Sequence, residues 1–328
     1  MRKSIYQQFK KLSYSNFQSK NCYTVTSVPY SKFHKLGIGS DGNAVFFIKS
    51  SVTGCVPNIN LELISIQFNE LCKLKSPSNS SIKEGYYTVI NLKTNQTDYI
   101  EYFLNIVHLI IEKIGETPSQ QKLLDEIQKL VDLFRWLSAP PVKTMQGLWA
   151  ELFVIEQSSN PSYLIKSWHK TVTDIFDFND GIDKIEVKST SRISRIHKFS
   201  HNQLTPNEGA NVVIASVCVQ QSGQGKTILD LKEAIDSKLD SVELRFLLAD
   251  MISKTLGSNF KKVGDCCFDY SMACDSYRTY NSKDIPFLDC KFIPIEISNI
   301  HYDCDLSKVH SIDVLSDVFP NSKLIKSL

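Results

Sequence analysis

Three residues in one short stretch of the sequence carry side chains that phosphodiester chemistry needs. Asp177 precedes an Asn-Asp-Gly sequence at 179–181, which is a strong hairpin turn signal, and Glu186 and Lys188 follow it. Because side chains alternate between the two faces of a strand, Glu186 and Lys188 share one face and lie within about 7 Å of each other. Asp177 on the first strand can meet Glu186 across the hairpin. The stretch therefore predicts two carboxylates beside a lysine.

This arrangement suits metal-assisted hydrolysis of a phosphodiester bond. Two carboxylates can hold a hard cation such as Mg²⁺ or Mn²⁺, which activates a bound water and neutralises charge on the reacting phosphate. Lys188 can position or deprotonate the attacking water, and it can stabilise the oxyanion. With carboxylates and no close histidine or cysteine, the site is expected to prefer Mg²⁺ or Mn²⁺ to Zn²⁺. The alternative is a solvated strand face with an ordinary Glu–Lys pair.

Four aspartates lie close to the turn, so strand geometry must select the metal ligand among them. They are Asp174, Asp177, Asp180 and Asp183. If Phe176 and Phe178 face a core, Asp177 points the opposite way. Asp174 and Asp180 then share the phenylalanine face, and Asp180 also belongs to the turn, where a local backbone hydrogen bond is its expected role. We therefore expect Asp177 to approach the glutamate, with like-charge repulsion raising both carboxylate pKa values when no metal is bound.

The elements around these residues indicate an α/β domain with a mixed central sheet flanked by helices. Apolar residues recur with the period of a helix in three segments and with the period of a strand in several others. The predicted helices are Lys143–Gln157, Leu229–Leu239 and Val242–Leu256, and the predicted strands are near Leu164–His169, Asp174–Phe178, Lys184–Ser189, Arg195–Phe199 and Asn211–Gln220.

The chain before residue 142 has a different character. Residues 1–95 contain three β-rich runs and predict a smaller N-terminal β-rich domain. Residues 96–141 are predicted to form a helical connector, with apolar stripes over Asp98–Ile114 and Gln120–Leu137. The Pro140–Pro141 pair ends the second helix, so we place a boundary there and assign residues 142–328 to the domain that carries the chemistry.

The composition is that of an ordinary soluble globular protein, with 42% apolar and 22% charged residues. A formal net charge of +2 does not argue for a nucleic-acid partner, so any basic surface must be local. The N-terminal segment lacks the apolar stretch of a signal peptide, and no segment is long enough to span a bilayer. Nine cysteines, an odd number, then predict a cytoplasmic protein with reduced thiols, and their spacing does not fit a zinc site.

A series of motifs after residue 146 occurs in an order that resembles a known family. The matching residues are Gly147-Leu148-Trp149-Ala150-Glu151-Leu152, Trp168, Asp177-Phe178, Ile185-Glu186-Val187-Lys188-Ser189, Arg195, His197, Phe199 and Gln203-Leu204. Together with the β-rich start and the two helices, they resemble the bacterial "PD-(D/E)XK motif protein" family of the restriction-endonuclease-like superfamily. This resemblance implies a nuclease core preceded by a smaller domain, in a restriction–modification or phage-defence system. Phe176 replaces the proline of the name motif.

The resemblance also implies roles for two residues outside the hairpin. Glu151 matches the acidic residue on the first core helix and is a candidate third metal ligand, although a solvated helix surface explains a glutamate there equally well. Gln203 is expected near the metal centre, where it could orient a water or a phosphate. Its alternative role is to start a helix that has Ser200 as the N-cap. Glu151 and Gln203 therefore join Asp177, Glu186 and Lys188 as catalytic candidates.

Four basic residues near the hairpin could contact phosphates. They are Lys170, Arg192, Arg195 and Lys198. The leading hypothesis is therefore a metal-dependent DNA endonuclease, and the alternative is a catalytically silent DNA-binding or scaffolding subunit. An enzyme that processes RNA or DNA ends fits the same site. The sequence leaves open whether other subunits of a restriction or defence system, or a second copy of the chain, take part.

Overall fold

A computed structural model describes residues 5–13, 22–29, 31–39, 41–49, 56–77, 79–169, 174–192, 194–205, 209–294 and 296–328. The chain divides into two compact units. One consists of Met1–Pro140 with Gly257–Lys261, and the other of Pro141–Leu256 with Lys262–Leu328. Helices and sheets occur in both units, so the protein is a mixed α/β protein, as the sequence predicts.

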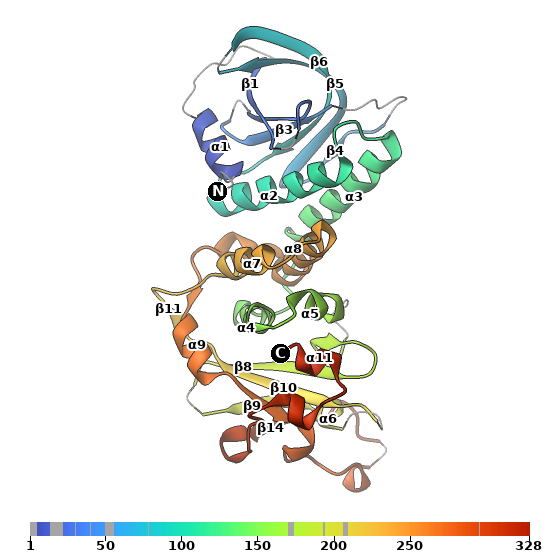
Figure 1. The fold of residues 1–328 in the computed structure, drawn as a ribbon, viewed down its shortest axis with the longest axis vertical. Coiled ribbons are helices and arrows are strands. Elements are labelled where there is room, and N and C mark those ends of the chain that lie inside the picture. Colours follow the sequence, from blue (N-terminus) through green and yellow to red (C-terminus); the bar gives the residue numbers. More distant parts are fainter. Residues whose placement is uncertain are drawn as a thin grey trace. The chain divides into compact units, whose positions relative to one another are not determined.

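A six-stranded sheet forms the centre of the first unit. Its strands are β1 (Cys22–Ser27), β2 (Lys35–Ile38), β3 (Ala44–Ile48), β4 (Ile59–Asn60), β5 (Ile64–Ser76) and β6 (Asn79–Leu92). They lie in the order β1-β2-β3-β6-β5-β4, and β1 also pairs in parallel with β5. This second pairing closes five of the strands into a barrel (Figure 1). β5 and β6 form its longest hairpin.

Three helices complete this unit: α1 (Ile5–Ser13), α2 (Thr97–Ile114) and α3 (Gln120–Trp136). The last two occupy the positions that the apolar stripes predict. Ser119 caps α3 by accepting a hydrogen bond from the backbone N–H of Lys122, at 3.3 Å. Phe103 of α2 packs on Phe46 of β3, with ring centroids 5.6 Å apart. α1 and α2 therefore pack on the barrel, and α3 packs on α2.

A segment from much further along the sequence also belongs to this unit. It forms the 3₁₀ helix η1 (Gly257–Lys262). The ring of Phe260 is fully buried against Tyr99 and Tyr102 of α2, at centroid distances of 5.0 and 4.8 Å. Gly257 has a φ of +49°, and a Cβ there would lie 2.3 Å from the carbonyl oxygen of Ala139. Only glycine fits this turn.

The second unit is built on a four-stranded sheet in the order β13-β10-β8-β7. The strands are β7 (Phe178–Asn179), β8 (Lys184–Thr190), β10 (Val212–Cys218) and β13 (Arg278–Asn281). β8 and β10 are parallel, and the two outer strands are antiparallel to their neighbours. Every residue of β10 is buried, which is why this strand reads as a continuous apolar run.

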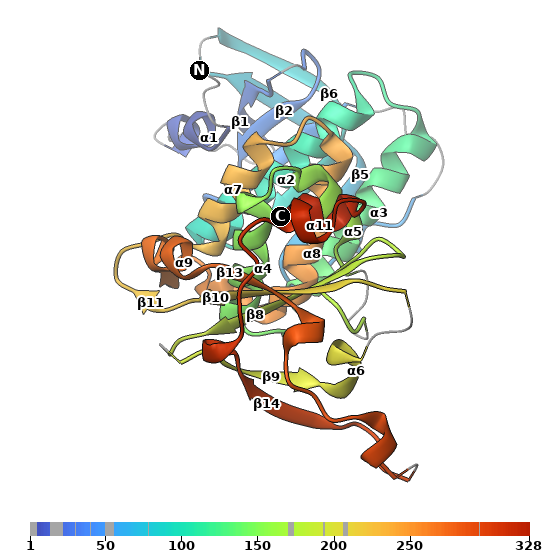
Figure 2. The ribbon, with the colours of Figure 1, turned by 60° about the horizontal axis from the view of Figure 1, so that its bottom comes forward.

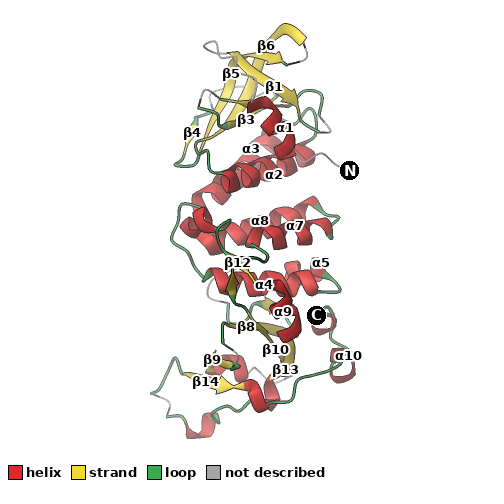
Figure 3. Cartoon of the chain, turned by 90° about the vertical axis from the view of Figure 1, so that its left-hand side faces the viewer, coloured by secondary structure: helices red, strands yellow, loops and turns green. Residues whose placement is uncertain are grey.

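Helices and a separate strand pair cover the two sides of this sheet. Within this unit, α4 (Met145–Gln157) and α5 (Pro161–Ser167) lie on one side. β9 (Ile196–Ser200) and β14 (His301–Asp305) lie on the other as an antiparallel pair (Figures 1 and 3). α6 (His201–Leu204) directly follows β9 (Figure 2). β8 thus lies between α4 on one face of the sheet and β9 on the other.

Two further helices, α7 (Ile228–Ser237) and α8 (Val242–Leu256), pack on α4 at the positions expected from sequence. The remaining elements are β11 (Gln221–Ser222), β12 (Cys267–Phe268), α9 (Tyr270–Ser276), η2 (Ser282–Asp284), η3 (Cys290–Phe292), η4 (Leu306–Lys308), α10 (Leu315–Val318) and α11 (Lys323–Lys326). In the part of the chain that the structure describes, no helix combines the length and the apolarity needed to cross a membrane.

One predicted strand is wrong and another is much shorter than predicted. Residues 164–169 were expected to be a strand, but they lie at the end of helix α5 and just beyond it. Asn160 caps this helix and Pro161 opens it, and both are signals for a helix start. The strand predicted at Asp174–Phe178 is limited to Phe178–Asn179, because the preceding residues bend away from the ladder.

Candidate active site

Strand β8 carries two residues of the predicted motif, Glu186 and Lys188, on one face. In the parallel register Glu186 is opposite Ile214 of β10, and Lys188 is opposite Ser216. The ammonium of Lys188 lies 2.7 Å from Oε1 of Glu186. The glutamate is 6% exposed, so the pair is not a solvated strand face.

Gln203 of α6 joins this pair. Its amide Nε2 donates to Oε1 of Glu186 at 2.7 Å, and its Oε1 accepts from Nζ of Lys188 at 3.0 Å. The same Oε1 accepts from the backbone N–H of Ser200, the residue that caps α6, at 3.1 Å. Gln203 therefore closes the start of a helix and also contacts the Glu186–Lys188 pair.

Asp177 lies just before β7 and contacts the edge of β8 with its side chain. Its Oδ2 accepts from the backbone N–H of Val187 at 2.8 Å, a donor that β7 is too short to reach. The alternation argument needs correction, since Phe176 and Phe178 do not share a face. Phe176 packs in a cluster with Ile214, whereas Phe178 is paired with Ile185. A bend, rather than regular alternation, directs Asp177 toward the site.

The other three aspartates have different surroundings. Asp180 serves the turn, because its Oδ1 accepts from the backbone N–H groups of Ile182 and Asp183, at 3.0 and 2.9 Å. The side chain of Asp183 accepts from the Asn211 amide at 2.8 Å. Asp174 is exposed. Asp177, in contrast, contacts the backbone of β8 through its side chain.

Glu151 of α4 is buried, with 3% of its surface exposed, so it does not belong to a solvated helix face. Its Oε2 accepts from the indole N–H of Trp168 at 2.7 Å and lies 3.2 Å from Nε2 of His169. Its Oε1 accepts from the ammonium of Lys143 at 2.7 Å. The same ammonium lies 2.6 Å from Oδ1 of Asp177, so Lys143 bridges the two carboxylates.

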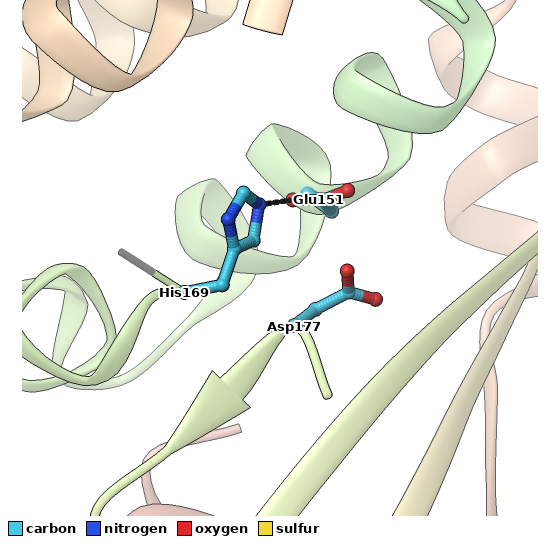
Figure 4. A group of neighbouring side chains, drawn as sticks. All are labelled: Glu151, His169 and Asp177. Atoms are coloured by element: carbon cyan, nitrogen blue, oxygen red, sulfur yellow. Dashed lines mark hydrogen bonds and ion pairs between the residues drawn. The ribbon is translucent and has the colours of Figure 1, made fainter. Parts of the chain in front are cut away.

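Two residues of this site, Lys143 and His169, were not found from the sequence. Lys143 stands before the N-cap of α4, and nothing in the local pattern links it to Asp177. His169 is brought in by its backbone N–H, which donates to the carbonyl oxygen of Asp177 at 2.8 Å. Figure 4 shows its imidazole beside Glu151 and Asp177. Its place next to Trp168, itself a motif residue, was the one available signal. The expectation that no histidine lies nearby is therefore wrong.

The surroundings of the site disfavour the charge of Asp177 and Glu186 but favour that of Glu151. Burial, followed by repulsion from Asp177, raises the pKa of Glu186 to about 8, although Lys188 partly opposes this. Burial and the charge of Glu151 raise the pKa of Asp177. Burial alone would raise the pKa of Glu151, but its bonds to His169 and Lys143 outweigh this and lower it. The expected increase for Asp177 and Glu186 is present, with desolvation as its main cause.

The basic residues proposed for phosphate contacts are not equivalent. Arg195 is tied to the fold, because it donates to Oγ of Ser216 at 2.8 Å and to the backbone carbonyl of Ser276. Arg192 and Lys198 are exposed and open to a ligand. Lys170 lies outside the described residues.

A metal ion would find suitable donors here. One ligand atom each from Glu151, His169 and Asp177 lies within 4.8 Å of the others. Carboxylate oxygens suit hard cations such as Mg²⁺ and Mn²⁺, and the imidazole widens the choice to transition metals. The donor set therefore fits a divalent cation. Glu186, a predicted ligand, is not in this group of three, although the charges of Asp177 and Lys143 act on its pKa.

Comparison with known proteins identifies a family for this chain. A family model described as "Putative PD-(D/E)XK family member, (DUF4420)" matches residues 8–307, which include the motif residues and most of both units. No curated protein and no solved structure matches the chain. The chain belongs to this PD-(D/E)XK-related family.

Proposed function

We propose that this protein is a metal-dependent nuclease that hydrolyses DNA phosphodiester bonds, with a restriction-endonuclease-like core in the second unit and a role in restriction or phage defence. The observation that carries the proposal is the assembly of Asp177, Glu186 and Lys188 at one edge of β8, with Glu151 of α4 beside them. Family membership supports the same reaction class. Burial of several carboxylates together costs stability, which a binding function alone does not explain.

Each side chain has a role in this proposal. Asp177 and Glu186, with Glu151, would hold Mg²⁺ or Mn²⁺, and the cation would activate water and neutralise charge on the phosphate. Lys188, 15% exposed, is placed to hold the attacking water or a phosphate oxygen. Gln203 fixes the Lys188 ammonium and the Glu186 carboxylate in one orientation, so that neither depends on the substrate for its position.

A second function, DNA binding without cleavage, is favoured by one observation. The ammonium of Lys143 already neutralises Glu151 and Asp177, as it would in a protein that has given up its metal. The two functions differ in a simple respect, because only the nuclease needs the carboxylates to exchange this lysine for another cation.

The test is an assay of purified full-length protein on supercoiled plasmid, linear DNA and RNA. We expect cleavage of DNA with Mg²⁺ or Mn²⁺, no cleavage with EDTA, and binding without cleavage in Ca²⁺. Glu233→Gln on the exposed face of α7 is the control substitution and should cleave like wild type. DNA binding without cleavage under every metal would favour the silent subunit, and cleavage that survives excess EDTA would exclude the metal-dependent mechanism.

A further inference from the structure

The ammonium of Lys143 occupies the position between two carboxylates that are proposed to bind metal. It lies 2.7 Å from Oε1 of Glu151 and 2.6 Å from Oδ1 of Asp177. The remaining oxygens of both carboxylates are engaged elsewhere. Oε2 of Glu151 accepts from Trp168 and contacts His169, and Oδ2 of Asp177 accepts from a backbone N–H. Oε1 of Glu151 and Oδ1 of Asp177 are thus the two oxygens that one cation already bridges.

We propose that Lys143 is an internal cation that holds the metal-free site together, and that a divalent metal ion takes its place when the site is loaded. The inference rests on the proposed function. An ammonium and a divalent cation cannot both lie against the same pair of oxygens, because a metal–oxygen distance of about 2.1 Å leaves no room for Nζ, and the two positive charges repel. Lys143 is thus a positioning residue that competes with the metal.

The surroundings of Lys143 allow this exchange. Its side chain is 30% exposed, whereas those of Glu151 and Asp177 are 4% and 9% exposed, so the lysine has a route to solvent that its partners lack. It stands immediately before Thr144, whose hydroxyl caps α4 by accepting from the backbone N–H of Gly147 at 3.1 Å. The helix start is therefore secured without Lys143, and its side chain can swing away while α4 keeps its position.

The same unit contains a matched control pair. Lys238 contacts Glu156, also a buried residue of α4, with Nζ 3.2 Å from Oε1. This lysine serves a single carboxylate, and Glu156 is not in the group of possible metal ligands. Removing either lysine leaves a buried carboxylate without its counter-charge, but only the removal of Lys143 vacates the proposed metal position.

The experiment measures Mn²⁺ and Mg²⁺ binding by calorimetry, and thermal melting with EDTA and with metal, for wild type, Lys143→Met and Lys238→Met in the full-length chain. Both variants should melt roughly 5–10 °C lower than wild type in EDTA. Lys143→Met alone should bind metal at least about tenfold more tightly and regain its melting temperature on metal addition. Metal affinity of Lys143→Met equal to or weaker than that of wild type would overturn the inference.

A second measurement uses wild-type protein and needs no variant to fold. Acylation of individual lysines, followed by mass spectrometry, should show Lys143 reacting faster once Mg²⁺ or Mn²⁺ is added, with Lys238 unchanged. An unchanged rate for Lys143 at saturating metal would contradict the exchange while leaving the nuclease proposal intact. Absence of metal binding by both wild type and Lys143→Met would instead overturn the proposed function, so the two failures are distinguishable.

Discussion

Two glutamates on the same helix, Glu151 and Glu156 of α4, are similar in their contacts and different in their neighbourhood. Both are buried, and each is engaged by a lysine ammonium and by an aromatic side chain that donates a hydrogen bond. The donors are Lys143 and Trp168 for Glu151, and Lys238 and Tyr270 for Glu156. By these pairwise contacts alone, both glutamates would be assigned a structural role.

The difference lies in the balance of charge. Glu156 is one carboxylate with one lysine. Around β8, in contrast, Glu151, Asp177 and Glu186 share two ammonium groups, those of Lys143 and Lys188. Fully ionised, the second group would carry a surplus negative charge, and the raised pKa of Glu186 reflects this, whereas the first group is balanced. A balanced buried pair holds the fold, whereas an unbalanced cluster indicates a ligand.

The largest expected effect comes from the strand pair. Glu186→Gln and Lys188→Ala should each lower single-turnover DNA cleavage at least about 1,000-fold, a loss of ~4 kcal/mol, because the first removes a proposed metal ligand and the second the group that holds water or phosphate. Glu156→Gln should cleave within about threefold of wild type. A Lys188→Ala variant that cleaves within about tenfold of wild type would show that the lysine has no catalytic role.

The next effect compares the two glutamates of α4 directly. Glu151→Gln should weaken Mn²⁺ binding by roughly 10–100-fold, as expected for a residue that touches or orients the metal. Glu156→Gln should leave Mn²⁺ affinity unchanged but lower the free energy of unfolding, since Lys238 loses its charged partner. Calorimetric titration and chemical denaturation measure the two quantities. Equal metal affinities for the two variants would remove the distinction between the glutamates.

A smaller effect concerns pH in the absence of metal. The pKa of Glu186 is about 8 in the folded protein and lies above its ordinary value of 4.5, so the folded state binds this proton more tightly than the unfolded state. Its contribution to stability is present below pH 4.5 and is lost as pH rises toward 8. Denaturation in EDTA should show this loss in wild type, and Glu186→Gln should reduce the slope. A wild-type profile parallel to that of Glu186→Gln would contradict the assignment.

The smallest expected change in metal binding comes from removing the first unit. We propose that residues 142–328 contain the whole site, so this fragment should bind Mn²⁺ within about threefold of full-length protein while DNA binding weakens. Phe260, which packs on Tyr99 and Tyr102, would become exposed, so the fragment should carry Phe260→Ser to limit aggregation. A folded fragment that binds no Mn²⁺ would contradict the placement of the site.

The sequence predicts the parts of the site that depend on local periodicity. Strand alternation places Glu186 and Lys188 together, and the apolar patterns locate α4, β8 and β10 within a few residues. It does not predict the direction of the Asp177 side chain, because a bend at Phe176 interrupts the strand alternation. Lys143 and His169 are not predicted either. They lie just before α4 and just after α5, and only the tertiary fold places them at the site. The family resemblance, rather than any pattern, provides Glu151.

The most direct test of the central claim compares two aspartates three residues apart. Asp177→Asn removes the carboxylate that contacts Lys143 and β8, whereas Asp180→Asn alters the turn and leaves the cluster intact. Single-turnover cleavage of supercoiled plasmid with Mg²⁺ should fall at least about 1,000-fold for Asp177→Asn and stay within about threefold of wild type for Asp180→Asn. Cleavage by Asp177→Asn at the wild-type rate, or loss of cleavage in Asp180→Asn alone, would contradict a metal-dependent nuclease site at this edge of β8.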